Sequence, residues 1–189
     1  SAISRLLGEK KDNEAKKTCA FCIWISLVFG LCISAILLLF RTQILGLLGV
    51  GKDTYQYANA YYTWIAIGAV SIIFSMVPSN ILRTEGLAVQ SMAGSIIGSI
   101  VNIIFDPIFI FGLNQGAAGA AMATVLGNII ADIYYVYAVV KKSKRLTCSP
   151  SHMKVTGRRI RDILMIGIPA SITNIMQTFM MVMTNNFLL

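Results

Sequence analysis

Charged residues are missing from long stretches of this chain, and these gaps constrain the fold more than any other feature. Between Glu85 and Asp132 the only charged residue is Asp106. A helix needs about 20 apolar residues to cross the hydrocarbon core of a bilayer. The uncharged stretches therefore predict five membrane-spanning helices, at residues 20–41, 54–81, 87–111, 117–140 and 163–189.

The composition agrees with a membrane protein. Hydrophobic residues make up 56% of the chain, charged residues only 13%, and the mean hydropathy is +0.72, whereas a soluble domain carries about 25% charged residues. The alternative, a set of buried helices in a soluble protein, would need a far larger protein to surround them. We therefore expect an all-α integral membrane protein that crosses the cytoplasmic membrane several times.

Both ends of the chain look like interruptions. It opens on SAISRLLGEKK, which is typical of the end of a helix, and it stops at NNFLL within an apolar run. We therefore expect this sequence to be a piece of a longer protein.

The basic residues predict the orientation of the spans. Alternating spans put residues 1–19, 82–86 and 141–162 on one side, and these segments hold all of the sixteen Lys and Arg except Arg41 and Lys52. Loops on the cytoplasmic side are enriched in Lys and Arg. The basic segments are therefore predicted to be cytoplasmic, and this topology accounts for the net charge of +8 without nucleic-acid binding.

Several classes of site lack the residues that they need. Cys19 and Cys22 form a CxxC, but no second pair exists to complete a zinc site, and the single His, His152, lies far away in a loop. No Ser/His/Asp set and no phosphate-binding loop can be built. We predict packing cysteines, no catalytic residues, no enzyme activity and no cofactor.

Glycine spacing indicates close helix packing. In AGSIIGSI, Gly94 and Gly98 lie four residues apart and share one face of a helix. Small residues at this spacing let membrane helices approach closely.

One acid stands inside an apolar run, in NIIFDPIFIFGLNQGAAGAAMAT (102–124). Asn102 and Asp106 are four residues apart and share a helix face. Pro107 removes a backbone donor and favours a kink there. An acid, an amide and freed carbonyls could bind a proton or a hard cation. Alternatively, Asp106 is a helix end at the outer interface, since it falls near the outer edge of its span.

The same run resembles the N-lobe signature of the multidrug and toxic compound extrusion (MATE) family. In that family an N-x-x-L-D-P-x-x-I-F segment ends helix five and a G-x-x-G-A-A-x-A-T segment opens helix six; Phe105 stands here for the usual Leu. ILRTEG (81–86) resembles the turn between helices four and five. IGIPASITNIMQ (166–177) resembles the start of helix seven, and SAISRLLGEKK the end of helix two.

The resemblance implies a fold and its division. The chain would be a partial polytopic helical bundle of a transporter with two lobes of six helices each. Residues 1–140 would be the partial N-lobe, from the end of helix two through helix six. Residues 141–162 would be the basic cytoplasmic loop between the lobes, and residues 163–189 the truncated helix seven of the C-lobe.

The resemblance also implies a function. Members of the family export cationic and amphipathic drugs in exchange for H⁺ or Na⁺. In one branch the coupling ion binds in the N-lobe, and Asn102, Asp106 and Thr124 match its residues directly. Tyr61 is the best match to a tyrosine on helix four, with Tyr62 as its neighbour. The same residues would hold Na⁺, and no other metal site is implied. Other branches use acids of the second lobe, which lie outside this chain.

The implied partners are a small-molecule drug and the lipid bilayer, and we expect the full-length protein to be a monomer. Two alternatives stay open. A lipid-linked oligosaccharide flippase of the same superfamily tends to carry several Arg or Lys in its lumen, and the spans here have no interior cation. A membrane scaffold without transport activity would not need the Asn, Asp and Thr set.

Overall fold

The computed structural model describes residues 2–9, 11–47, 51 and 54–143, together with isolated positions between 161 and 184. Its elements are α1 (Ala2–Gly8), α2 (Asp12–Leu39), α3 (Arg41–Leu47), α4 (Tyr55–Thr84), α5 (Ala88–Pro107), a π-helical turn η1 (Ile108–Gly112) and α6 (Gly116–Lys142). Within this described part all elements are helical. The loop predicted at 141–162 lies largely outside the described residues, and the span predicted at 163–189 is described only at separate positions.

Four of the five predicted spans are confirmed as helices that are long and apolar enough to cross a membrane: Asp12–Leu39, Tyr55–Thr84, Ala88–Gly112 and Gly116–Lys142. The first begins eight residues earlier than the apolar run predicted. Asp12 and Glu14 lie in its first turn, where negative side chains interact favourably with the helix dipole. Charged turns therefore extend this helix beyond its apolar part.

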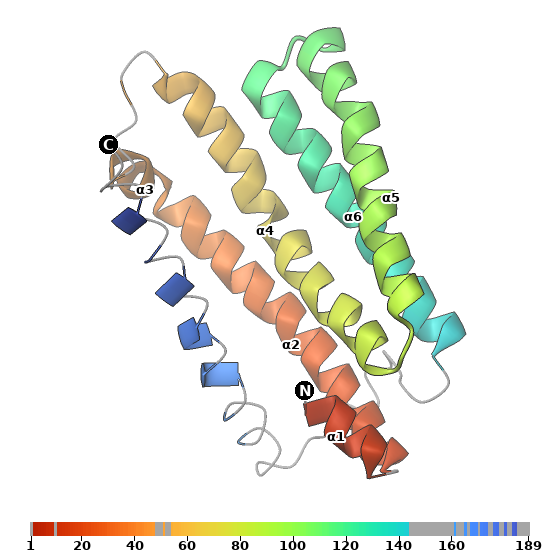
Figure 1. Ribbon diagram of the computed structural model, residues 1–189. Coiled ribbons are helices and arrows are strands. Elements are labelled where there is room, and N and C mark those ends of the chain that lie inside the picture. The colour runs from red at the N-terminus through yellow and green to blue at the C-terminus, as the bar shows by residue number, and fades with distance from the viewer. Residues whose placement is uncertain are drawn as a thin grey trace.

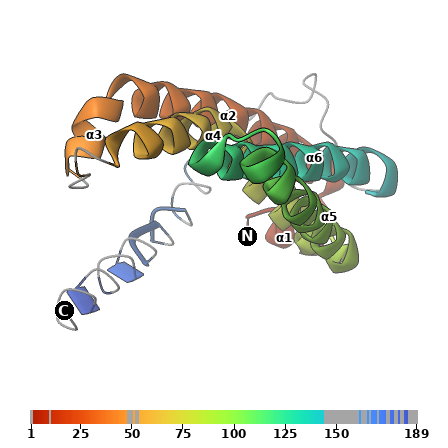
Figure 2. The same cartoon turned by 90° about the horizontal axis from the view of Figure 1, so that it is seen from above.

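Three of the long helices, α2, α4 and α6, lie side by side, and the fourth, α5, packs on α6. Figures 1 and 2 show α4 between α2 and α6, with α5 packed beside α6. α4 and α6 run in the same direction, and α2 and α5 run opposite to them. The basic ends, with Arg83 in the last turn of α4 and Lys141 and Lys142 in the last turn of α6, consequently lie at the same end of the bundle.

The helices approach one another closely at glycine residues, as the glycine spacing predicts. A Cβ placed on Gly68 of α4 would lie 2.2 Å from Val125 of α6, and one on Gly94 of α5 would lie 2.2 Å from the ring of Tyr135. A Cβ on Gly119 would lie 2.6 Å from the backbone of Phe109. Lipid tails are as apolar as the side chains of the helices, so the hydrophobic effect does not drive membrane helices together. Close packing at such glycines does.

Polar side chains connect α2 to α4. Ser34 donates a hydrogen bond to the carbonyl oxygen of Ala66 (2.7 Å), and the Tyr62 hydroxyl donates to that of Leu37 (3.1 Å). Both bonds satisfy polar groups that lipid could not satisfy.

The predicted irregularity at Pro107 is present. α5 ends at Pro107 and the chain continues as the π-helical turn η1, in which the amide of Leu113 donates to the carbonyl of Ile108 (3.0 Å). Pro107 has no N–H for the carbonyl of Ile103, four residues before it. A local π turn is one way for a membrane helix to absorb such a break, and π turns are frequent at functional sites.

Replacing Gly127 with Ala is expected to destabilise the bundle by about 1–3 kcal/mol, as overpacking of a close contact does. A Cβ at this position would lie 2.6 Å from the carbonyl oxygen of Gly98, a backbone atom that can move only if α5 moves. Thermal unfolding of the full-length protein in detergent measures the effect. Gly46→Ala in α3 is the matched control, since nothing lies within 4 Å of a Cβ there. Equal melting temperatures for the two variants would contradict the role given to this contact.

Candidate functional site

Three helices carry rows of polar residues on the sides that meet inside the bundle. The row on α5 continues through Asn102 to Asp106, and α4 and α6 have rows of the same kind at spacings of three and four residues, which keep side chains on one face. The rows are Ser71, Ser75 and Ser79 on α4; Ser91, Ser95, Ser99, Asn102 and Asp106 on α5; and Thr124, Asn128, Asp132 and Tyr135 on α6.

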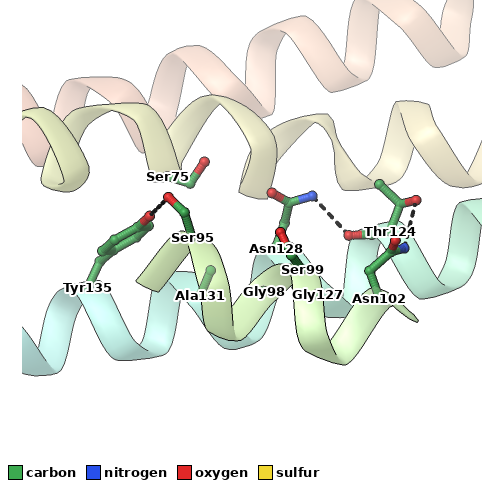
Figure 3. Close-up of a pocket in the computed structure, with 10 residues that line it drawn as sticks. All are labelled: Ser75, Ser95, Gly98, Ser99, Asn102, Thr124, Gly127, Asn128, Ala131 and Tyr135. Atoms are coloured by element: carbon green, nitrogen blue, oxygen red, sulfur yellow. Dashed lines mark hydrogen bonds between the residues drawn. The ribbon is translucent and has the colours of Figure 1, made fainter. Parts of the chain in front are cut away.

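Where these rows converge they enclose a cavity of about 330 Å³ (Figure 3). Its polar lining comes from all three helices, and its floor is made by the small residues Gly98, Gly127 and Ala131. The polar lining residues are Ser75, Ser95, Ser99, Asn102, Thr124, Asn128 and Tyr135. A polar cavity between membrane helices is a place where water, an ion or a ligand can bind.

Asn102 and Thr124 meet at one end of the cavity. The Asn102 amide Nδ2 donates to the Thr124 hydroxyl at 3.3 Å (Figure 3). That hydroxyl donates to the carbonyl oxygen of Ala120 at 2.9 Å. The missing side chain of Gly127 lets α5 approach α6 next to this contact, because a Cβ there would lie 2.6 Å from the carbonyl oxygen of Gly98. The structure thus brings together two of the four predicted site residues.

Asp106 lies one turn beyond Asn102 on α5, at the end where α5 gives way to η1. It is half-buried and does not line the cavity. Its oxygen Oδ1 is buried without a hydrogen-bond partner among the described residues. A buried carboxylate oxygen without a donor is costly, so this oxygen is an available ligand for a proton or a cation.

Tyr61 lies apart from the Asn102–Thr124 pair. It is 43% exposed and lines a second, apolar cavity of about 400 Å³, together with Leu45, Tyr57 and Ala117 among others. The hydroxyl of its neighbour Tyr62 donates to Leu37, as described above. In the described part of the chain, no hydrogen bond joins either tyrosine to Asn102, Asp106 or Thr124.

The end of the cavity nearer to the basic residues continues as a chain of hydrogen bonds. The Tyr135 hydroxyl bonds to that of Ser95 (2.8 Å; Figure 3) and donates to the carbonyl of Ser91 (3.2 Å). The Ser91 hydroxyl bonds to that of Ser79 (2.9 Å) and accepts from Nε of Arg83 (3.0 Å). Polar contacts therefore run from the basic end of the bundle to the cavity.

Sequence reasoning assigned no role to Asn128, Ser75, Ser95, Ser99, Tyr135 or Asp132. The spacing of polar residues could have indicated a shared polar face on α6, since Thr124, Asn128 and Asp132 follow one another at intervals of four residues. Serine and threonine are frequent in membrane helices, where they also bond to their own backbone, as Ser75 does to Ile72 (2.9 Å). The spacing on one helix does not reveal which hydroxyls face a cavity.

Known proteins with similar sequences and structures agree on one family. The MatE family model matches residues 1–108. Multidrug export protein MepA of Staphylococcus haemolyticus (strain JCSC1435) is 33% identical over 186 residues, which cover 98% of this chain and 41% of that protein. The chain thus spans about two fifths of the length of the curated relatives that it matches.

Solved structures give the same result in two conformational states. An inward-facing conformation of a multidrug resistance MATE family transporter of the MOP superfamily superimposes with a TM-score of 0.84 and 30% identity, covering 90% of this chain and 39% of that chain. An outward-facing conformation of such a transporter superimposes with a TM-score of 0.85 and 29% identity, covering 92% and 39%. The helices described here therefore match both states equally well.

A double-mutant cycle on Asn102→Ala and Thr124→Val is expected to give a coupling energy of about 0.5–2 kcal/mol, the range for hydrogen bonds between membrane helices. The measurement is the unfolding free energy of the full-length protein in each of the four variants. Pairing Asn102→Ala with Ser34→Ala, which removes a bond between α2 and α4, serves as the control and should be additive. Additive effects for Asn102 and Thr124 as well would contradict the contact.

Proposed function

This chain belongs to the MatE family, and we propose that it forms most of the N-lobe of a secondary active transporter that exports cationic and amphipathic drugs in exchange for H⁺ or Na⁺. Like its relatives, it is a multi-pass protein of the cell membrane. The proposed transport requires no chemical step on the substrate, so the protein is not an enzyme in this proposal. It needs no cofactor beyond the coupling ion.

The observation that carries the proposal is the unpartnered Asp106 Oδ1 at the end of a polar row that contains the hydrogen-bonded Asn102 and Thr124. An acid within a membrane span is costly and is retained mainly where it moves ions or protons. Binding of a proton or Na⁺ would neutralise Asp106 and lower the cost of burying it. Release of the ion would restore the charge and favour a state in which water reaches the site.

Coupling then follows from a difference in affinity between two states. An ion can drive a conformational change only if it binds one state more tightly than the other. The equal match of these helices to inward- and outward-facing relatives supports a lobe that moves as one unit, as in the alternating access of transporters. We propose that an ion bound at Asp106 stabilises one packing arrangement of this lobe. The drug binds more tightly to the other arrangement, so binding of the ion and binding of the drug oppose each other.

The polar cavity between α4, α5 and α6 offers a route for the ion. It adjoins Asn102 and Thr124, and the hydrogen-bond chain from Arg83 through Ser91 and Tyr135 leads towards it from the basic end of the bundle. In this proposal, ions pass the hydroxyl and amide groups of the cavity as far as Asn102 and Thr124, and Asp106 lies one turn beyond Asn102.

Replacing Asp106 with Asn in the full-length protein that carries this sequence is expected to abolish coupled drug export, because the side chain can no longer gain or lose a charge. The measurement is ethidium efflux from cells under imposed pH and Na⁺ gradients, and the gradient that drives wild-type efflux identifies the ion. Undiminished efflux in Asp106→Asn, at equal expression, would overturn the assignment of coupling to this lobe. Absence of efflux even in the wild type would favour the flippase alternative.

The matched control is Glu9→Gln, which also removes one negative charge. Glu9 lies outside the long helices, and hydrogen bonds from Lys11 (2.7 Å) and Arg5 (3.2 Å) hold the pKa of its carboxyl below the usual value. It therefore stays charged at neutral pH and takes no part in the site. Efflux by this variant is expected to equal that of the wild type.

A further inference from the structure

A second carboxylate lies deep in the bundle, and the site described above does not use it. Asp132 is on α6, ten residues before its end at Lys142 and sixteen after its start at Gly116. At 1.5 Å per residue these intervals are about 15 Å and about 24 Å. Asp132 is therefore well inside the membrane-spanning part of α6, in the half nearer to the basic end.

The contacts of Asp132 are incomplete. Ser71 of α4 donates a hydrogen bond from its hydroxyl to Oδ2 of Asp132. The other oxygen, Oδ1, is buried without a hydrogen-bond partner among the described residues. One neutral hydroxyl leaves most of the cost of burying a carboxylate charge uncompensated.

The described residues of the helices that pack on α6 place no cation near the Asp132 carboxylate. On α4, the nearest basic residue is Arg83, about 18 Å along the helix from Ser71, and it bonds to Ser91. On α6 itself, Lys141 and Lys142 lie in the last turn. The α5 helix contributes Asp106, a like charge, near its far end. Arg5 and Lys11 form ion pairs with Glu9.

No cation comes from the other described side chains near this part of the bundle. The hydroxyl of Tyr135 bonds to Ser95, on the side of α6 that faces α5. The α2 helix packs on α4, and its charged residues lie in its first two turns, at the basic end. Two ways to offset this negative charge are therefore a bound cation and a proton on the carboxyl group itself.

The number of oxygen ligands at Asp132 distinguishes a bound cation from a proton. A hard cation such as Ca²⁺ or Mg²⁺ takes six or more oxygen ligands. Asp132 and Ser71 supply three oxygens. Within the described residues, no group of three or more His, Cys, Asp or Glu side chains could hold a metal ion. A proton needs only one oxygen. It removes the charge and turns Oδ1 into a donor, while Ser71 still bonds to Oδ2.

We propose that Asp132, with Ser71 as its hydrogen-bond partner, is a second proton-binding site of this chain, separate from Asp106 and beside the polar cavity, between the levels of Asn128 and Tyr135 on α6. The proton comes from the aqueous phase at the basic end and binds to Oδ1. Asn128, one turn before Asp132, and Ser75, one turn after Ser71, both line the cavity, so the site adjoins it. Its part in transport rests on the proposed function, but proton binding does not.

Infrared difference spectroscopy on the full-length protein in lipid, stepped between pH values without drug, measures the carbonyl stretch of protonated carboxyl groups. Asp132→Asn is expected to remove one such band. Ser71→Ala is expected to shift the frequency of the same band, because it removes the hydrogen bond to Oδ2. Ser75→Ala is the matched control, since this hydroxyl bonds to the carbonyl of Ile72, and it should leave the band unchanged.

Each alternative has its own outcome. Unchanged bands in Asp132→Asn would overturn the proposal. Should that variant fail to fold, Ser71→Ala decides alone, and an unshifted band overturns the proposal. A band that is absent at physiological Na⁺ concentration and appears only when Na⁺ is removed would overturn the proposal, because a cation would then hold the site in place of a proton. Asp106→Asn should leave this band in place, so failure of the proposed export function and failure of this site are distinguishable.

Discussion

The close approach of α5 to α6 at Gly98 and Gly127 is the contact on which the other features of this bundle depend. No Cβ fits on Gly127, since it would lie 2.6 Å from the carbonyl oxygen of Gly98. Lipid tails are as apolar as leucine, so helices in a membrane associate through such close packing rather than through the hydrophobic effect. Because backbone meets backbone here, the contact fixes the register of the two helices, and this register brings Asn102 opposite Thr124.

Register in turn decides which polar groups are satisfied. Ser34, Tyr62 and Ser95 each bond to a group on a neighbouring helix, as the absence of water in the hydrocarbon region requires. Two carboxylates within the spans, Asp106 and Asp132, keep a buried oxygen without a partner in the described part of the chain. The fold tolerates this cost at the two positions where a change of charge could alter helix packing, and both proposals rest on these positions.

The cavity adjoins both acids: its lining residue Asn102 is one turn from Asp106, and its lining residue Asn128 is one turn from Asp132. Its lining combines hydroxyl and amide groups from three helices, whereas the outer faces of the same helices are apolar; Ile96, Ile103 and Ile133 are among their exposed residues. A polar interior within an apolar exterior is the arrangement that lets ions enter a membrane protein without exposure to lipid. The similarity of this part of the chain to both inward- and outward-facing relatives is consistent with a lobe that keeps its internal packing while the access to it changes.

The sequence by itself determined the number, order and approximate limits of the described spans and the use of glycine at their interfaces, because hydropathy and helical spacing are properties of one segment at a time. It also singled out Asn102, Asp106 and Thr124, through the resemblance to the MATE family. The tertiary structure decided what lies across from each residue: Tyr61 faces an apolar cavity apart from Asn102, and Ser71 faces Asp132. Such pairings depend on the register and crossing of separate helices, which glycine contacts between distant parts of the chain set and which no periodicity within one helix encodes.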